Sequence, residues 1–367
     1  MIVPLLDLRA QYRQLQNEVD AAVHRVLESS EFIGGRESEC LERELAGYLG
    51  VTDVVTVNSG TDALVLSLKA LGVGSGDEVI VPSFTFFATA AAVSLAGATP
   101  KFADCAPDSY NVDISALQKA KGQHTKAVIV VHLFGEPVDL SPIQKWCTEH
   151  GLWLIEDAAQ AIGARYADQS VGSVGDIGAF SFYPTKNLGA FGDGGAIACR
   201  DPAIARCLRQ LRNHGRAGRY EHQVIGCNSR LDEIQAAILR AKLPFLDTWN
   251  ERRRRLAARY QRGLQGTVCR WQTANVQATP VYHQFVIRHP QRDALQAFLT
   301  THGIATAVFY SIPCHLQPAL AESHGEVSLQ HAERLSEEVL ALPIYPELTE
   351  EAVDHVTGLV HLFEQQR

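Results

Sequence analysis

The feature of this sequence that most constrains its fold is a repeated alternation of two patterns between residues 52 and 199. Short, nearly continuous apolar runs alternate with longer segments whose apolar residues recur at helical spacing. A continuous apolar run such as DVVTV (53–57) predicts a strand buried on both faces, because a strand with one wet face alternates apolar and polar residues. Strands that alternate with helices build parallel sheets. The pattern therefore predicts an α/β fold, with a mostly parallel central sheet and helices on both of its faces.

Turn and cap residues place the individual elements. The segment DLSPIQKWCTEHG (139–151), for example, carries helix start and stop signals and ends in a glycine. The runs IGAFSF (177–182) and GGAIAC (194–199) add two short strands with no helix between them. The preceding strands are expected at 53–57, 77–83, 99–104, 126–135 and 152–159, and the preceding helices at 61–71, 86–97, from 115 onward and at 139–151.

The pattern of strand and helix signals changes after residue 199. The helix pattern SRLDEIQAAILRAKL (229–243) has its apolar residues on one face, and Pro244 then breaks or kinks it. We expect two domains, a large α/β domain with an N-terminal arm (1–240) and a smaller α+β domain (241–367). In the last third, strands are expected at 279–288 and 304–310, and helices at 292–303, near 327–340 and near 349–364.

Charge and cysteine content disfavour several classes of function. The net charge of −8 argues against a nucleic acid or an anionic membrane as partner, because both attract basic surfaces. The basic run Arg252–Arg255 continues a helical pattern and is interpreted as a solvated helix face. The eight cysteines form no C-x-x-C pair and the histidines no metal-binding motif, so we expect reduced thiols in a cytoplasmic protein and no metal site. We expect no signal peptide, and no stretch approaches the roughly 20 apolar residues of a membrane-spanning helix.

Three segments follow strands at the edge where parallel α/β sheets bind their ligands. The first is VNSGTDAL, in which a strand ends at Val57 and a helix opens near Thr61. Ser59, Gly60 and Thr61 present backbone N–H groups at this helix N-terminus, where the helix dipole and the small glycine favour a phosphate group. The alternative is an ordinary helix cap without a ligand, which is the more common arrangement.

The second segment is IEDAAQAIG, which ends an apolar strand in a carboxylate. Burial of an unpaired carboxylate is costly, so Asp157 must be paired or functional. Gln160 lies three residues further on and can face the same side. The alternative is that Asp157 merely caps a following helix.

The third segment, FSFYPTKNLG, places Lys186 in an aromatic- and glycine-rich loop after Ser181. A lysine in a partly dry setting loses its proton more easily and becomes a nucleophile. The alternative is an ordinary surface lysine. Together the three segments supply a phosphate seat, an acid and a lysine, which are the groups that pyridoxal 5'-phosphate (PLP) requires.

Longer motifs carry a resemblance to a known family. They are NSGTDAL, GDEVIVPSFTFFAT, IEDAAQAIGARY, FSFYPTKNLGAFGDGGAI, LRNHG and NSRLDEIQAAIL, spread from about Leu5 to Ile238, with a looser match in FYSIPCHLQPAL. In this order the motifs resemble those of the DegT/StrS family of PLP-dependent nucleotide-sugar aminotransferases. The resemblance implies PLP as cofactor and the aspartate aminotransferase fold, known as PLP fold type I.

By position, the resemblance implies a role for each matching residue. Lys186 would form a Schiff base with the cofactor and then act as general base and acid, and Asp157 would keep the pyridinium nitrogen protonated. Gln160 would bind the ring oxygen, and Phe86 would stack on the ring face. Asn228 would reach the phosphate of the neighbouring subunit, which implies a homodimer with shared active sites. The phosphate of the same subunit would be held by Ser59, Gly60, Thr61 and Ser181.

The resemblance also implies a reaction, in which L-glutamate donates its amino group to a nucleotide-linked keto-6-deoxy-hexose. The run FYPTKNLGAFGDGGA is similar to the subgroup that acts on 3-keto sugars, so we expect a dTDP- or UDP-linked 3-keto sugar, with dTDP preferred. Cys227 and the run FYSIP depart from the common family pattern, which affects substrate contacts only. The candidate substrate contacts are Tyr183, Tyr310, His315 and Arg230.

Three other functions remain as alternatives. The first is an aminotransferase for 4-keto sugars linked to dTDP or UDP. The second is a regulatory member of the family that has lost turnover. The third, a sugar dehydratase, is disfavoured because that branch replaces the Schiff-base lysine with histidine, whereas Lys186 is present here.

Overall fold

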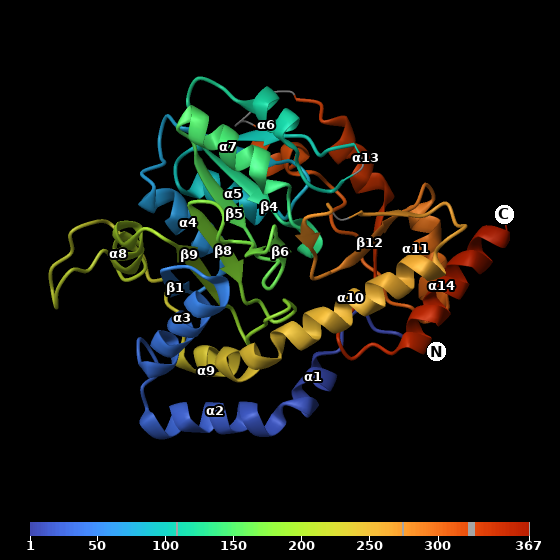
Figure 1. Ribbon diagram of the computed structural model, residues 1–367, viewed down its shortest axis with the longest axis horizontal. Helices are drawn as coiled ribbons and strands as arrows, with labels where there is room; N and C mark the ends of the chain where they lie inside the picture. The colour runs from blue at the N-terminus through green and yellow to red at the C-terminus, as the bar shows by residue number, and fades with distance from the viewer. Residues whose placement is uncertain (108, 274, 322–326, 367) are drawn as a thin grey trace.

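A seven-stranded sheet forms the centre of the structure (Figure 1). The structure is a computed structural model that describes residues 1–107, 109–273, 275–321 and 327–366. The strands of this sheet follow the order β1-β9-β8-β5-β4-β2-β3. They span Asp53–Val57 (β1), Gly195–Cys199 (β9), Ile177–Ser181 (β8), Trp153–Asp157 (β5), Thr125–Val131 (β4), Glu78–Pro82 (β2) and Thr99–Ala103 (β3).

Neighbouring strands from β8 to β3 pair in parallel, whereas β9 runs against both β8 and β1. The connection from β8 to β9 contains no helix, and a strand that returns without a crossover pairs antiparallel with its predecessor. The prediction of a mostly parallel sheet is confirmed. The antiparallel strand is the one that the sequence places directly after another strand.

Helices cover both faces of this sheet. Successive strand residues point to opposite faces, so Val54 belongs to one hydrophobic core and Val55 to the other. This double coverage explains why the strands are apolar almost throughout. One core contains side chains from α3 (Arg36–Leu49), α6 (Ile114–Ala120) and α7 (Leu140–His150), and the other from α4 (Gly60–Ala70), α5 (Ala88–Leu95) and α8 (Pro202–Leu211).

Pro244 lies within a long helical segment, which it kinks but does not end. Helix α9 (Glu233–Lys242) passes through a 3-10 turn (Leu243–Phe245, η2) into the long helix α10 (Leu246–Gly263). The helix begins later than the predicted residue 229, because Ser229 is held in the preceding loop by hydrogen bonds with Asn58 and the carbonyl of Arg212. The N-terminal helices are α1 (Leu8–Gln14) and α2 (Gln16–Ser29), and α2 runs beside α9 at the lower edge of Figure 1.

A second, smaller layer lies at the far end of α10 (Figure 1). Its antiparallel sheet consists of β10 (Arg270–Trp271), β12 (Phe285–Arg288) and β13 (Val339–Leu342), packed with α10, α11 (Arg292–Thr301) and α14 (Glu350–Gln365). Val3 joins the core of this layer, and α10 supplies Leu246 to the main core and Leu256 to the smaller one. Because these segments contact both cores, the domain boundary at residue 240 stays a prediction.

One prediction in the last third is wrong, and two are correct only in part. The run at 304–310 forms no strand, because Ala305 donates its N–H to the carbonyl of Val3, and Ala307 pairs with Ala341 only in an isolated bridge. The strand predicted at 279–288 pairs with β13 over only residues 285–288. The helix predicted near 327–340 is present as α13 (Gln330–Glu338), but it ends two residues early because β13 begins at Val339. The remaining short elements are β6 (Arg165–Tyr166), β7 (Gln169–Ser170), β11 (Ala278–Thr279), η1 (Leu133–Gly135), η3 (Cys314–Leu316) and η4 (Pro318–Leu320).

Within the described residues, no helix has both the length and the apolar character needed to cross a lipid bilayer.

Candidate active site

A lysine and a carboxylate meet at the carboxyl ends of two adjacent strands. Asp157 is the last residue of β5, and Lys186 lies in the loop that follows the neighbouring strand β8. Burial lowers the pKa of the Lys186 amine to about 8, and the charge of Asp157 works against that shift. A large fraction of the amine is therefore neutral near pH 8, as a nucleophilic lysine requires. This setting differs from that of an exposed surface lysine.

The Asp157 carboxylate is 5% exposed and has two hydrogen-bond donors. The Thr89 hydroxyl donates to one carboxylate oxygen at 2.8 Å, and the Ala159 N–H donates to the other at 3.2 Å. Burial raises the pKa of Asp157, whereas the bonds from Thr89 and Ala159 and the charge of Lys186 lower it. The helix-cap alternative for Asp157 is wrong, because turns follow β5 and no helix begins there.

Gln160 connects the acid-bearing loop to a tyrosine from the last third of the chain. Its side-chain oxygen accepts a hydrogen bond from the Phe134 N–H at 2.7 Å, and its side-chain nitrogen donates to the Tyr310 hydroxyl at 3.1 Å. The Tyr310 ring lies 6.0 Å from the ring of Phe86, which is 56% exposed. The structure thus brings together three residues that the sequence assigned separately to cofactor and substrate. An exposed aromatic ring beside a buried acid is suited to stacking on a planar ligand.

The expected phosphate seat lies at the N-terminus of α4. Ser59 caps this helix by accepting a hydrogen bond from the Asp62 N–H at 3.1 Å, so its hydroxyl has the capping role of the alternative interpretation. Gly60 and Thr61 occupy the first turn, where backbone N–H groups lack helical acceptors. A Cβ on Gly60 would lie 2.7 Å from the Ser181 Cβ, so this position accepts only glycine. The three predicted segments therefore converge, with Ser181 packed directly against the helix N-terminus.

A buried amide network holds the loop that carries Lys186, which we call the lysine loop (residues 184–191), from the side of the smaller layer. The Asn187 side chain donates to the Asn250 side-chain oxygen at 2.7 Å and to the Val281 carbonyl at 3.2 Å. The Asn187 side-chain oxygen lies 3.2 Å from His283 Nδ1. Burial, together with the charges of Lys186 and Arg253, holds the pKa of His283 well below its usual value, so this imidazole is neutral. Sequence patterns missed His283, because its partners lie far from it along the chain.

A second buried carboxylate lies beside Asp157 in the sequence. Glu156 is fully buried and accepts hydrogen bonds from the N–H groups of Gly172, Val174 and Gly175, each at 2.7 Å, and from His132 Nε2 at 2.9 Å. Burial alone would raise the pKa of Glu156, but His132 and the loop amides lower it. Glu156 therefore fixes the loop before β8 and places no free carboxylate in the site. The only sequence signal for it is the pair of acids that ends the strand.

The other residues predicted to contact the cofactor or the substrate lie in different surroundings. Tyr183 is 52% exposed at the rim of the lysine loop, and Asn228 is exposed in the loop before α9. The Arg230 guanidinium donates to the Asn213 side-chain oxygen at 3.0 Å. His315 is 3% exposed, and its two ring nitrogens lie 2.5 Å from the Ser83 hydroxyl and 3.3 Å from the Glu333 carboxylate. These protein contacts occupy both nitrogens, so the substrate role of His315 stays a prediction without a contact that supports it.

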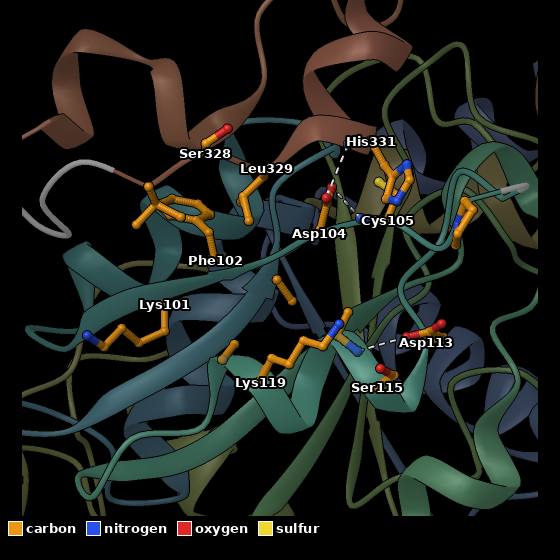
Figure 2. A pocket seen from close by; sticks show the side chains of 15 residues that line it. Lys101, Phe102, Asp104, Cys105, Asp113, Ser115, Lys119, Ser328, Leu329 and His331 are labelled. Atoms are coloured by element: carbon orange, nitrogen blue, oxygen red, sulfur yellow. Dashed lines mark hydrogen bonds between the residues drawn. The ribbon is translucent and has the colours of Figure 1, made fainter.

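Figure 2 shows a cavity of about 590 Å³ at the free edge of β3, between α6 and the segment before α13. None of the residues of the candidate site lines it. The Asp104 carboxylate accepts hydrogen bonds from the N–H groups of His331 and Ala332, and Lys101 pairs with Glu78 at 3.2 Å. The Asp104 carboxylate thus holds the first turn of α13 beside the end of β3, whereas the Lys101–Glu78 pair joins β3 to β2. The cavity is thus separate from the candidate site.

One group of possible metal ligands lies in the smaller layer. Ligand atoms of Cys269, His289 and Glu364 lie within 4.8 Å of one another. The Gln291 N–H donates to His289 Nδ1 at 2.9 Å, so the proton of a neutral imidazole is on Nε2, which faces Glu364. A protonated Nε2 offers no lone pair to a metal ion. The geometry therefore indicates a polar contact between helix and sheet.

Comparison with known proteins places this site in a family. The family model described as the DegT/DnrJ/EryC1/StrS aminotransferase family matches residues 13–361. A UDP-N-acetyl-3-dehydro-alpha-D-glucosamine 3-aminotransferase of Acidithiobacillus ferrooxidans is 46% identical, with 98% of this chain and 97% of the relative covered. A dTDP-3-amino-3,4,6-trideoxy-alpha-D-glucose transaminase of Streptomyces venezuelae is 47% identical, over 94% and 92% of the two chains. A pleiotropic regulatory protein of Geobacillus stearothermophilus is 46% identical, over 99% of each chain.

Solved structures agree with these sequence relatives. Streptomyces venezuelae DesV, solved in complex with a ketimine intermediate, superposes with a TM-score of 0.96 at 45% identity, covering 99% of this chain and 98% of that one. NtdA of Bacillus subtilis, solved with its bound cofactor PMP, superposes with a TM-score of 0.91 at 31% identity, covering 99% and 86%. The fold type expected from the sequence is confirmed.

Proposed function

The chain belongs to the DegT/DnrJ/EryC1/StrS aminotransferase family, and we propose that it transfers the amino group of L-glutamate to carbon 3 of a nucleotide-linked keto-6-deoxy-hexose. The observation that carries this proposal is the pairing of a half-buried amine, Lys186, with a buried carboxylate, Asp157, at adjacent strand ends. This pair is what an amino transfer on PLP requires from its protein.

The residues of the candidate site fit PLP. Lys186 provides the amine that binds the cofactor covalently, and Asp157 provides a carboxylate for the pyridinium nitrogen. Gln160 would bind the ring oxygen through its side-chain amide, and Phe86 offers an exposed ring face for stacking. The phosphate would be held by Gly60, Thr61 and Ser181 around the N-terminus of α4 that Ser59 caps. PLP, when bound, supplies an electron sink that stabilises negative charge on the carbon next to the amino group.

The two ionisable groups have separate tasks in this reaction. Asp157 holds a proton on the pyridinium nitrogen, since the Thr89 bond and the charge of Lys186 both favour the charged carboxylate. Lys186 Nζ would take the proton from the α-carbon of the amino donor and give it up before the donor product leaves, and in the second half of the reaction it would deliver a proton to the sugar carbon that receives nitrogen. A lysine whose pKa is about 8 can both accept and release a proton near neutral pH.

The relatives support carbon 3 as the position that receives nitrogen. One relative carries a UDP sugar and another a dTDP sugar in its name, and both names specify the 3-position. We propose a dTDP-linked substrate, with the UDP-linked sugar and the 4-keto sugar as the alternatives that an assay must compare. A regulatory role, which one relative's name carries, is not favoured here because Lys186 and Asp157 retain the setting that turnover requires.

We also propose a cytoplasmic homodimer with shared active sites. Asn228 supports it, because this polar side chain is exposed and free to reach the phosphate seat of a second subunit. A largely apolar groove along α2 provides surface for such a contact, and it is lined by Tyr12, Val19, Asp20, Val23, His24, Leu27 and Phe191. Analytical ultracentrifugation would test the dimer directly.

The experiment that tests the function is a panel of single turnovers. The protein is charged with amino groups by glutamate, the donor is removed, and dTDP- and UDP-linked 3-keto and 4-keto sugars are offered separately. The proposal predicts a 3-amino sugar, identified by mass and by the position of the new C–N bond, with the dTDP substrate fastest. Transfer to 4-keto sugars only, or no transfer to any member of the panel, would refute it.

A further inference from the structure

A buried lysine, distinct from Lys186, lies against the loop that carries Lys186. Lys242, the last residue of α9, is 1% exposed. Its Nζ donates a hydrogen bond to the Gly189 carbonyl at 2.7 Å and lies 4.2 Å from the ring centroid of Phe191. Both contacts are with the part of the lysine loop (residues 184–191) that follows Lys186.

Burial of this amine has a cost that packing alone does not explain. Removal from water lowers the pKa of Lys242 to about 8, with the charge of Glu347 acting in the opposite direction. An apolar side chain of similar length would fill the same space without that cost. The cation over the Phe191 ring and the bond to Gly189 are directional contacts that such a side chain would lack.

The lysine loop is a tight turn whose ends meet. A Cβ on Gly189 would lie 2.3 Å from the Pro184 carbonyl oxygen, so these two residues pack backbone against backbone around Lys186. The Lys186 N–H donates to the Tyr183 carbonyl, and the Ala190 N–H donates to the Phe182 carbonyl, each at 2.8 Å. A shift of Gly189 is therefore passed on to the backbone of Lys186.

Helix α9 holds this turn at two points. Lys242 binds the Gly189 carbonyl. About two turns earlier on the same helix, Gln235 accepts a hydrogen bond from the Phe191 N–H at 2.8 Å. The Asn187 network holds the opposite side of the same loop. The lysine loop is thus clamped between α9 and the smaller layer, with Lys186 between the clamps.

We propose that Lys242 is a positioning residue for amino transfer, which fixes the lysine loop through Gly189 and Phe191 so that Lys186 faces Asp157. Lys242 itself does not react. This inference rests on the proposed function, because it assigns a task within that reaction.

Lys242→Met tests the proposal, because methionine fills the space but neither donates nor carries charge. Lys126→Met is the matched control, since Lys126 also donates from Nζ to a glycine carbonyl, that of Gly72 at 2.8 Å, but far from the loop. In the holoenzyme we expect Lys242→Met to lower kcat on the order of 10- to 100-fold, with the KM for the keto sugar within about twofold of wild type. Lys126→Met should leave both parameters unchanged.

A second readout does not depend on activity. In the full chain stripped of cofactor, acetic anhydride labels Lys186, and mass spectrometry gives the pH of half-maximal labelling. The wild type and Lys126→Met should give a midpoint near pH 8, the pKa that burial sets for Lys186. A loosened loop exposes the amine to water, so the midpoint of Lys242→Met should rise toward the ordinary lysine value of about 10.4.

Folded Lys242→Met protein with wild-type kcat and an unchanged labelling midpoint would overturn the proposal. If that variant does not fold, Phe191→Leu removes the ring that Lys242 and Tyr12 contact but keeps the Lys242–Gly189 bond, and it should shift the midpoint in the same direction by a smaller amount. An unchanged midpoint in folded Phe191→Leu would then overturn it. Failure of the proposed function looks different, since the wild type itself would transfer no amino group.

Discussion

The Thr89 hydroxyl donates a hydrogen bond to the Asp157 carboxylate at 2.8 Å, across 68 residues of sequence. Thr89 lies on α5, and α5 packs on the face of the sheet opposite to α7. In a buried setting this single donor helps to keep Asp157 charged, because burial alone raises the pKa of the carboxyl group. The acid of the candidate site therefore depends on the last residue of a different motif, GDEVIVPSFTFFAT, a threonine for which the sequence suggested no role.

Replacement of Thr89 by valine should weaken the reaction most strongly at low pH. Loss of the donor raises the pKa of Asp157 further, so the carboxylate takes up a proton at a higher pH than in the wild type. We expect kcat/KM to fall about 10-fold at neutral pH and the acid limb of its pH profile to move upward. Thr56→Val is the control, since it removes a buried threonine–carboxylate bond, to Glu42, away from the site. Parallel pH profiles for both variants would contradict this role of Thr89.

Attachment of the cofactor should follow the ionisation of Lys186. Only the neutral amine attacks, and burial places the pKa of Lys186 at about 8, so the attachment rate should rise with pH and level off above pH 8. Stopped-flow absorbance after addition of PLP to the stripped protein measures this rate. A midpoint near the ordinary lysine value of about 10.4 would show that the amine is not held in a dry environment.

Tyr310→Phe should weaken cofactor binding with little effect on folding. The change leaves the Gln160 side-chain nitrogen without the Tyr310 oxygen as acceptor, which costs about 1 kcal/mol for a neutral hydrogen bond, or about fivefold in affinity. Equilibrium dialysis of PLP measures the difference. Tyr220→Phe, at a fully exposed position, serves as control. Equal affinity in all three proteins would remove Gln160 and Tyr310 from the binding site.

Glu156→Gln should destabilise the fold in a pH-dependent manner. The buried carboxylate has a lowered pKa, so its stabilisation is complete above the unfolded value of about 4.3 and is lost as pH falls through the folded value. We expect a loss of roughly 3 kcal/mol in the free energy of unfolding at pH 7, which shrinks in acid. Urea unfolding at several pH values measures it, with the exposed Glu149→Gln as control. A difference that is constant with pH would contradict an ionised Glu156.

Local patterns predicted the main sheet because its strands and helices differ in period and are separated by turn residues. They also singled out Lys186, Asp157 and Gly60 as candidate site residues, since each lies at or just after the end of a strand in a segment whose residue types have few other uses. The strand expected at 304–310 is wrong for a physical reason. Its apolar side chains pack beside the active site, against Phe84 and its neighbours, whereas its backbone lacks a continuous partner strand.

The supporting residues could not be predicted in the same way. Thr89, His283 and Lys242 act through partners that lie 53 to 96 positions away along the chain. A buried threonine, histidine or lysine has no distinctive local sequence, because its role is set by what the fold places opposite to it. His315 illustrates the converse, since a plausible substrate histidine is occupied by Ser83 and Glu333.

The role of Lys186 in the proposed amino transfer is tested most directly by mapping the lysine that binds the cofactor. Lys186 and Lys242 are both buried enough to lower their pKa to about 8, but only Lys186 is paired with the Asp157 carboxylate. Borohydride reduction of the PLP-bound protein, followed by peptide mass spectrometry, identifies the attached residue. The role proposed for Lys186 predicts the reduced adduct on Lys186 alone and none in Lys186→Ala. An adduct on Lys242 or on another lysine, or no adduct at all, would contradict it.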